Sequence, residues 1–217
     1  MCNQGCVGER FCGASACHDA VLSNVCSINQ ATALLDGQRA DEDAGISLAQ
    51  VLAATCTSPD GGAIAIGSSP QLDAGILATN GEPLLTGPLL CVGGGSFFQR
   101  SIDWLESSGF AHVRDTGTTT QYQLTTRDGG VVAMGPLANL GPTRDLFILQ
   151  LVRAPSGAVV LNSGGYHAEG TVAGAWYFQN VLLPMRTSLT SPWYVYEWTD
   201  VNSNGPDLTD TFTRLAP

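Results

Sequence analysis

Charged residues are scarce in this sequence, and lysine is absent. Only 13% of the residues are charged, against a usual share of ~25%, and all nine basic residues are arginines. Nineteen acidic residues bring the net charge to −10 and the pI to about 4.4. Binding to a phosphate backbone needs a clustered basic face, because affinity comes from the counterions that neutralised phosphates release. The sequence has no such cluster, so we expect no nucleic-acid partner and favour cation binding or an extracellular surface.

Long hydrophobic runs are missing as well. A membrane-spanning helix needs ~18–20 mostly apolar residues in a row, and no stretch of the sequence approaches this length. No signal peptide precedes Met1, although the numbering also fits a chain whose leader has been removed. We therefore expect no membrane span.

Motifs of nucleotide-binding and hydrolytic enzymes are absent. The glycine-rich stretches 93–95 and 164–165 match neither G-x-G-x-x-G nor the P-loop, which requires a lysine. We interpret both stretches as tight turns between a strand and a helix, and we note that the nucleophile motif G-x-S-x-G is missing too. A hydrolase would have to combine a serine beside glycines with one of the three histidines, namely Ser163 or Ser96 with His167 or His112. We expect a protein that is not an enzyme.

Cysteine, in contrast, is abundant near the N-terminus. Five of the seven cysteines precede residue 27, and so many free thiols are hard to maintain in a reducing cytosol without a metal. Export is the simpler interpretation, so we expect an extracellular or cell-surface protein with a cysteine-rich N-terminal segment at 1–26. The odd count leaves one cysteine over. Cys2 lies where the acylated cysteine of a lipoprotein would be, and the other six suffice for three disulfides.

Hydrophobic periodicity predicts an α/β domain over residues 27–217. Residues 27–56 have a helical pattern, with Ser27 as an N-cap, and GGAIAIGSS is a short strand candidate. Two units, at 88–108 and 158–182, each combine an apolar run, a glycine turn and an amphipathic helix, while RDGG and PSG mark hairpins. PWYVYEWTD is the last predicted strand. We predict a layered mixed sheet of strand-Gly-Gly-helix units with inserted β-hairpins, plus the cysteine-rich N-terminal cap.

Near the C-terminus, the stretch DVNSNGPDLTD gathers oxygen-bearing side chains around a glycine bend. Five residues supply them: Asp200, Asn202, Asn204, Asp207 and Asp210. Calcium is a hard cation that takes six to eight oxygen ligands. The stretch resembles the D-x-N-x-D-G-x-x-D-x-x-D loop of thrombospondin type 3 repeats, which implies calcium at these five residues. Two departures are that Asn204 replaces an acid and that one residue is missing after Gly205. A plain polar turn is the alternative.

The segment CGASACH has the spacing C-x4-C-H at Cys12, Cys17 and His18. It resembles the lengthened variant of the haem-attachment site of c-type cytochromes. The resemblance implies thioether bonds from both cysteines to the haem vinyl groups and an axial bond from His18 to the iron. The sixth ligand would be another histidine or a methionine.

Two other interpretations of the N-terminal cysteines remain open. One is a zinc or iron–sulfur site formed by five cysteines and a histidine, namely Cys2, Cys6, Cys12, Cys17, Cys26 and His18, although this spacing matches no familiar ligand pattern. The other is a disulfide-stapled cap that can also link to Cys56 and Cys91. Each disulfide stabilises a fold by ~2–4 kcal/mol, which matters for a segment with few apolar residues of its own.

The two strand-Gly-Gly-helix units and the YVYEWTDVNSNGPDLTD ending are similar to patterns in archaeal surface-layer proteins. The resemblance covers about residues 60–217 and implies a secreted α/β domain that packs against copies of itself. We therefore predict a surface-layer-like or filament-like structural protein, stapled by disulfides and binding calcium. Exposed aromatic residues in PWYVYEW are candidates for contacts between copies, although they fit a core equally well. The alternative function is extracellular electron transfer by haem c or another metal centre at the N-terminal segment.

Overall fold

The structure is a computed structural model in which a seven-stranded mixed sheet forms the centre of the molecule. The structure describes residues 10–13, 16–27, 30–35, 39–56, 65–70, 76–84, 88–92, 100–115 and 120–217. The sheet has the strand order β12-β11-β9-β10-β5-β3-β4. Its strands are β3 (Gln30–Leu35), β4 (Ala65–Pro70), β5 (Pro88–Val92), β9 (Arg144–Arg153), β10 (Val159–Gly165), β11 (Trp193–Thr199) and β12 (Thr211–Ala216).

The sheet is parallel on one side and antiparallel on the other. The strands β4, β3, β5 and β10 run parallel, whereas β9, β11 and β12 pair antiparallel with their neighbours. The two strands at the centre, β9 and β10, are almost completely buried along their length. Continuous apolar burial of this kind arises where both faces of a sheet are covered.

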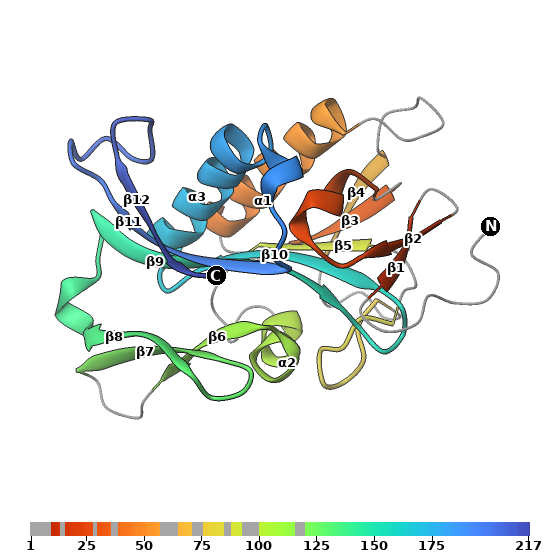
Figure 1. Cartoon of the computed structure of the whole chain (residues 1–217), viewed down its shortest axis with the longest axis horizontal. Coiled ribbons are helices and arrows are strands. Elements are labelled where there is room, and N and C mark those ends of the chain that lie inside the picture. Colours follow the sequence, from red (N-terminus) through yellow and green to blue (C-terminus); the bar gives the residue numbers. More distant parts are fainter. Residues whose placement is uncertain are drawn as a thin grey trace.

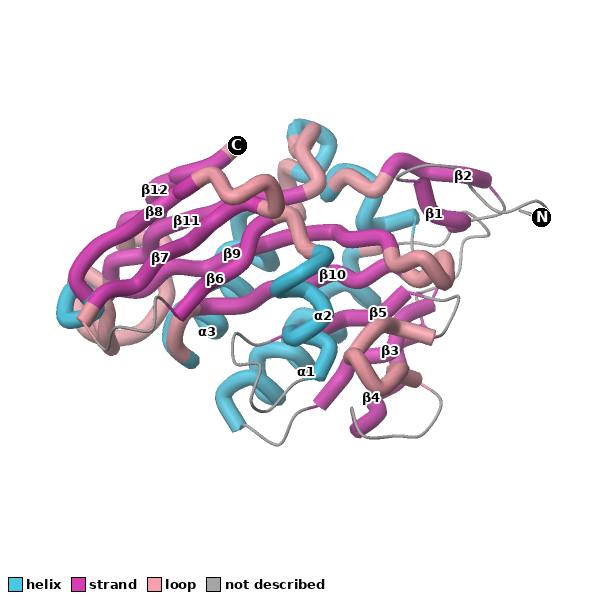
Figure 2. The backbone as a smooth tube through the Cα atoms, turned by 90° about the horizontal axis from the view of Figure 1, so that it is seen from below, coloured by secondary structure: helices cyan, strands magenta, loops and turns pink. Residues whose placement is uncertain are grey.

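Two different layers cover the two faces (Figure 1). The helices α1 (Arg39–Thr55) and α3 (Ala168–Tyr177) lie on one face, and a π-helical turn (Phe178–Leu182) extends α3. The helix α2 (Arg100–Ser108) lies on the other face, next to a three-stranded sheet. That sheet consists of β6 (Ala111–Asp115), β7 (Gln121–Thr126) and β8 (Val131–Pro136). Figure 2 shows it against the antiparallel side of the central sheet.

The remaining short elements lie near the N-terminus and in the connections. The hairpin β1–β2 (Arg10–Gly13 and Ala16–Asp19) precedes the 3-10 helix η1 (Leu22–Ser27). Two further 3-10 turns, η2 and η4, span Leu137–Asn139 and Arg186–Ser188. Because Leu22 and Val25 are fully buried in the main core, η1 packs as part of the body and not as a separate cap.

The predicted fold class is confirmed, with one wrong element. Both strand-to-helix units form, as β5 with α2 and β10 with α3, and the hairpins β7–β8 and β9–β10 form around RDGG and PSG. The helical prediction for 27–56 holds only for α1. Ser27 ends η1 instead of capping a helix, and QATALL forms β3, paired between β4 and β5. A short run of Ala and Leu has no decisive period, and the neighbouring strands override its helix propensity.

Other details of the sequence prediction also need correction. PWYVYEWTD forms β11, but β12 follows it and is the last strand. Gly164 and Gly165 belong to the end of β10, and the turn comes after them. The stretch 93–95 lies outside the described residues.

The aromatic residues of β11 are part of the core. Tyr194, Tyr196 and Trp198 are between 1% and 4% exposed and belong to the cluster under α1 and α3. Phe147 stacks on Tyr196 with ring centroids 5.4 Å apart. These side chains are therefore not available as contacts between copies.

A buried glutamine fastens the second layer to the central sheet. Gln150 of β9 is 2% exposed, and its Oε1 accepts the N–H of Phe110 at 2.8 Å. Its Nε2 donates to the carbonyl of Ala111 at 3.3 Å and to Oδ1 of Asn162 at 3.1 Å. A Cβ at Gly109 would lie 2.8 Å from Oε1 of Gln150. Gly109, the glycine after α2, is thus needed to leave space for the Gln150 side chain. The C-cap pattern in the sequence does not predict this steric requirement.

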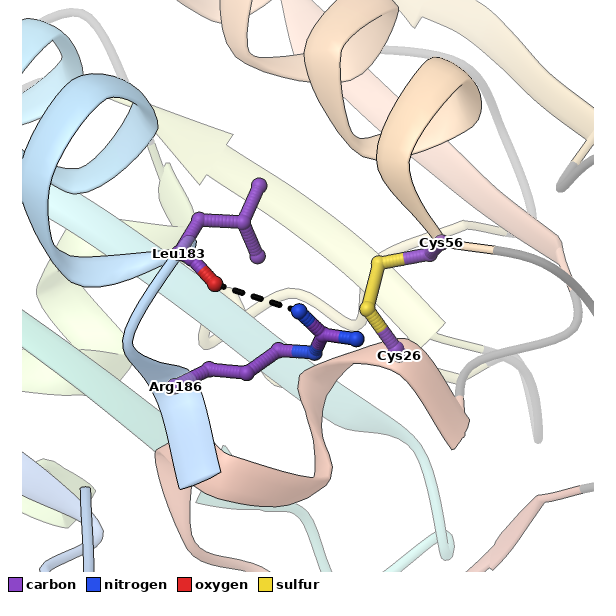
Figure 3. Close-up of a disulfide and its surroundings, with 4 residues drawn as sticks. All are labelled: Cys26, Cys56, Leu183 and Arg186. Atoms are coloured by element: carbon purple, nitrogen blue, oxygen red, sulfur yellow. Dashed lines mark hydrogen bonds between the residues drawn. A yellow bond between two sulfur atoms is a disulfide. The ribbon is translucent and has the colours of Figure 1, made fainter. Parts of the chain in front are cut away.

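One disulfide joins η1 to the end of α1 (Figure 3). Cys26 and Cys56 are bonded and are 30 residues apart in sequence. The guanidinium of Arg186 points toward this disulfide and donates from Nη1 to the carbonyl of Leu183 at 3.3 Å. The predicted link from the N-terminal cysteines to Cys56 is confirmed.

We expect the double substitution Cys26→Ser and Cys56→Ser to lower the free energy of unfolding by about 2–4 kcal/mol, because the cross-link restricts the unfolded chain. Urea unfolding of the wild type and the variant measures the difference. The pair Cys26→Ala and Cys56→Ala is the control for polarity, since Cys56 is only 1% exposed. Equal stability of the serine pair and the wild type would contradict the prediction.

Candidate functional site

The loop between β11 and β12, residues 200–210, contains all five predicted calcium ligands and is called the Asp/Asn loop here. Asp200 begins it and is 7% exposed. Its Oδ1 accepts the N–H groups of Asn202 at 3.1 Å and Ser203 at 2.6 Å, and its Oδ2 accepts that of Gly205 at 2.9 Å. Ser203 and Gly205 have positive φ angles of 59° and 88°. The chain therefore bends tightly around the Asp200 carboxylate.

Asp207 organises the outer side of the loop. Its Oδ2 accepts the amide Nδ2 groups of Asn202 and Asn204, both at 3.1 Å. Its Oδ1 accepts the N–H and the hydroxyl of Thr209, both at 2.6 Å. Hydrogen bonds from Thr209, Asn202 and Asn204 hold the pKa of Asp207 well below its usual range. These hydrogen bonds therefore favour the ionised form of the Asp207 carboxyl.

Asp210 ties the end of the loop to the core. Its Oδ2 accepts the indole N–H of Trp198 at 2.9 Å and the backbone N–H of Asp207 at 3.1 Å. Its Oδ1 accepts the N–H of Val201 at 3.2 Å. All three carboxylates of the loop are thus engaged by donors of the loop itself or of β11.

The five predicted ligands lie in one loop, but they do not form a ready coordination shell. No group of three or more Asp, Glu, His or Cys side chains suited to a metal ion occurs in the part of the chain that the structure describes. The donor types still fit calcium, because carboxylate and amide oxygens are its preferred ligands. Binding would replace the hydrogen bonds of Asn202 and Asn204 to Asp207. The calcium site at these five residues stays a prediction.

A pocket opens between the Asp/Asn loop and the start of α3. Its volume is about 390 Å³, within the range of ~300–1,000 Å³ for small-molecule sites. Apolar side chains form much of its lining, namely Pro142, Ala168, Val172, Trp198 and Pro206. Glu169 and Asp200 also line it. The pocket lies beyond the carboxyl ends of β10 and β11, where open α/β sheets commonly bind ligands.

A buried carboxylate fixes the start of α3 beside this pocket. Asp145 of β9 is fully buried, and its Oδ2 accepts the N–H groups of His167 at 2.8 Å and Gly170 at 2.9 Å. The side chain of the N-cap residue, His167, makes no capping bond. Asp145 therefore caps α3 from a neighbouring strand. Burial raises the pKa of Asp145 to about 6, against the opposing effect of the N–H groups of His167 and Leu146.

Of the two serines in the hydrolase alternative, the structure describes Ser163, and this serine is not paired with a histidine base. Ser163 is fully buried, and its hydroxyl makes no hydrogen bond to either histidine. His112 is also buried, and its Nε2 pairs with the hydroxyl of Thr125 at 2.9 Å. His167 lies 3.6 Å from Asp145, measured from Nδ1 to Oδ1. Ser96 lies outside the described residues.

The N-terminal cysteine site is only partly described. Cys12 and Cys17 face each other in the β1–β2 pairing, and Cys17 is disulfide-bonded. A sulfur in a disulfide is not free for a thioether bond to haem, and Cys26, bonded to Cys56, is not free to ligate a metal. His18 lies next to Cys17 in β2. Cys2 and Cys6, with the predicted lipid anchor, lie outside the described residues.

The sequence did not indicate Asp145, Glu169 or Trp198 as parts of a site. Asp145 and Glu169 lie on β9 and α3, and only the fold brings them near the Asp/Asn loop, whereas Trp198 lies in β11, the strand that leads into the loop. Glu169 carried one local signal, because an acid in the first turn of a helix is typical of an N-terminus.

Comparisons with known proteins give no assignment. No family model matches the chain, and no curated protein matches it significantly. Among the described helices, none has the length and apolar character needed to cross a membrane.

We expect Asp145→Asn to reduce the pH dependence of stability. Because the folded pKa of about 6 exceeds the ordinary 3.8, the contribution of this carboxyl is complete below 3.8 and is lost as the pH rises through about 6. The stability difference between wild type and variant should therefore shrink across this window. Urea unfolding at several pH values measures it, with the exposed Asp43→Asn as control. A difference that is constant with pH would contradict the prediction.

Proposed function

We propose that this chain is an extracellular structural protein, not an enzyme, that assembles with copies of itself and binds calcium at the Asp/Asn loop. The observation that carries the proposal is the oxidised state of three of its cysteines. Cys26 and Cys56 form a disulfide, and Cys17 is disulfide-bonded as well. Disulfides persist in oxidising compartments outside the cytosol. We do not carry the haem alternative further, because it needs the sulfur of Cys17.

The geometry of the Asp/Asn loop supports calcium binding. Asp200, Asp207 and Asp210 lie within one bend whose turn at Gly205 takes a positive φ angle. All described hydrogen bonds to these three carboxylates come from uncharged donors. A divalent cation would relieve the repulsion among three carboxylates in so short a segment.

The open edges of the two sheets support self-assembly. The strand β12 is bound by β11 on one side only, and β8 is likewise an edge strand. The two strands lie near each other, as Figure 2 shows. An edge strand presents unpaired backbone groups to which another strand can add. A register shift near Leu215 makes β12 irregular. Regular pairing of β12 with a strand of a second copy would therefore be limited to the first residues of β12.

The distribution of charged residues also favours contact between copies at these edge strands. Copies of a chain with a net charge of −10 repel each other in general. The strand β8 (VVAMGP) has no charged residue, and β12 (TFTRLA) has only Arg214. Val131 and Met134 of β8 are 55% and 62% exposed. Two copies can meet along the uncharged, partly apolar strip that β8 forms without facing like charges.

We expect calcium to raise the melting temperature of protein that has been stripped with a chelator, because a ligand of the folded state stabilises it by mass action. The variant Asp207→Asn should weaken calcium binding by about tenfold or more, since affinity depends on the number of charged ligands. Calorimetric titration measures the affinity.

The matched control for this test is Asp128→Asn. Asp128 is also an exposed acid in a turn, and its Oδ1 is bonded to the hydroxyl of Thr126. Calcium affinity should be the same in this control as in the wild type. Absence of any calcium effect on the melting temperature, or an equal loss in both variants, would refute the calcium site.

We expect the double variant Val131→Glu and Met134→Glu to dissociate assemblies of this chain, because it places acids on the uncharged strip of a chain that is already acidic. Sedimentation velocity of the wild type and the variant measures the assembly state. The control is Leu84→Glu, which introduces an acid at an apolar residue that is 50% exposed elsewhere. A wild type that remains monomeric at high concentration would overturn the self-assembly proposal.

A further inference from the structure

We propose that the pocket between the Asp/Asn loop and α3 binds a small organic cation, an alkyl group with an amine or guanidine head. This site goes beyond calcium binding and self-assembly and does not depend on either. The observation that carries it is a cavity of about 390 Å³ with largely apolar walls and carboxylates at its lining.

The apolar walls call for an alkyl body. Pro142, Val172 and Pro206 contribute to the lining from three separate segments, and Trp198 contributes from the core strand β11. Trp198 is 1% exposed, and its hydrogen bond to Asp210 fixes its orientation. A ligand without apolar surface would leave these side chains in contact with water.

The lining charges call for a positive head group. Glu169 and Asp200 are the charged side chains of the lining, and no arginine belongs to it. Asp200 is already bonded to three N–H groups of its own loop. Glu169 lies in the first turn of α3 and is half-buried. Because Asp200 is already bonded in this way, the carboxylate of Glu169 is the group that would meet an ammonium or guanidinium. Such charge-assisted hydrogen bonds are stronger than those between neutral groups.

An anionic ligand is disfavoured, although a helix begins here. The N–H groups of His167 and Gly170 at the start of α3 already donate to the buried Asp145. Two of the N–H groups at this helix end are therefore already used inside the protein, and the pocket itself is lined by Glu169 and Asp200. An incoming phosphate or carboxylate would meet two like charges without free N–H donors from these two residues.

The test compares four small probes by ligand-observed NMR titration with chelator present, so that calcium has no influence. Butylamine and butylguanidine carry the expected head groups, butanol is the neutral probe, and butyrate is the anionic probe. A fifth probe, N-acetyl-arginine amide, distinguishes a free cation from an arginine side chain of a peptide. We expect both cations to bind more tightly than butanol, and butyrate to bind most weakly.

Two variants locate the site. Glu169→Gln should weaken binding of the cations by about tenfold and leave butanol binding unchanged. Its control is Glu82→Gln, a half-buried acid in a segment that contributes nothing to the lining. Ala168→Trp, at an exposed position of the lining, should block all probes without disturbing the fold, which circular dichroism checks.

The outcomes separate clearly. Preference for cations that is lost in Glu169→Gln and retained in Glu82→Gln supports the proposal, and binding of the arginine amide then identifies a peptide side chain as a suitable ligand. Equal binding of butanol and butylamine, equal effects of the two glutamine variants, or no binding of the cations in the millimolar range would overturn it.

Discussion

The close contact of α3 with the centre of the sheet is the constraint on which the rest of the site depends. A Cβ at Gly165 would collide with the backbone of Thr171, and one at Gly170 would lie 2.6 Å from the carbonyl oxygen of Leu146. A Cβ at Gly174 would come within 3.0 Å of the Phe147 ring. Only glycine allows the helix to pack so near the strands. The short distance in turn allows Asp145, on a strand, to reach the N–H groups at the start of the helix.

This arrangement makes one buried carboxylate responsible for the position of the whole first turn of α3. Burying a charge without hydrogen bonds is costly, and Asp145 is compensated by three N–H groups, those of Leu146, His167 and Gly170. Its raised pKa indicates that the compensation is incomplete. Burial of this carboxylate therefore has an electrostatic cost. The same carboxylate fixes the start of α3, and this helix start places Ala168 and Glu169 in the lining of the pocket.

The sequence predicted the layered sheet because its long elements have unambiguous patterns. The runs that form β9 and β10 are mostly apolar, and the residues after β10 switch to a helical period. The segment QATALL misled because its residues favour helices locally, while β4 and β5 supply the backbone partners that make it a strand.

The candidate site was predictable only where its residues are close in sequence. The Asp/Asn loop could be named residue by residue, because its five oxygen side chains lie within 200–210. The pocket beside it could not be predicted, since its lining brings together Pro142, Glu169 and Trp198 from separate segments of the chain. Even in the loop, spacing alone did not reveal that the carboxylates turn toward the loop's own N–H groups.

Trp198 connects these features into one unit. Its side chain belongs to the core under α1 and α3, the residue lines the pocket, and its indole N–H donates to Asp210 at the end of the Asp/Asn loop. Asp200 joins the same unit from the other end, because it both lines the pocket and anchors the first bend of the loop. The wall of the pocket and the conformation of the loop therefore cannot change independently. Any ligand that prefers one arrangement of the loop must alter the affinity of the pocket, and linkage requires the reverse effect to be equally large.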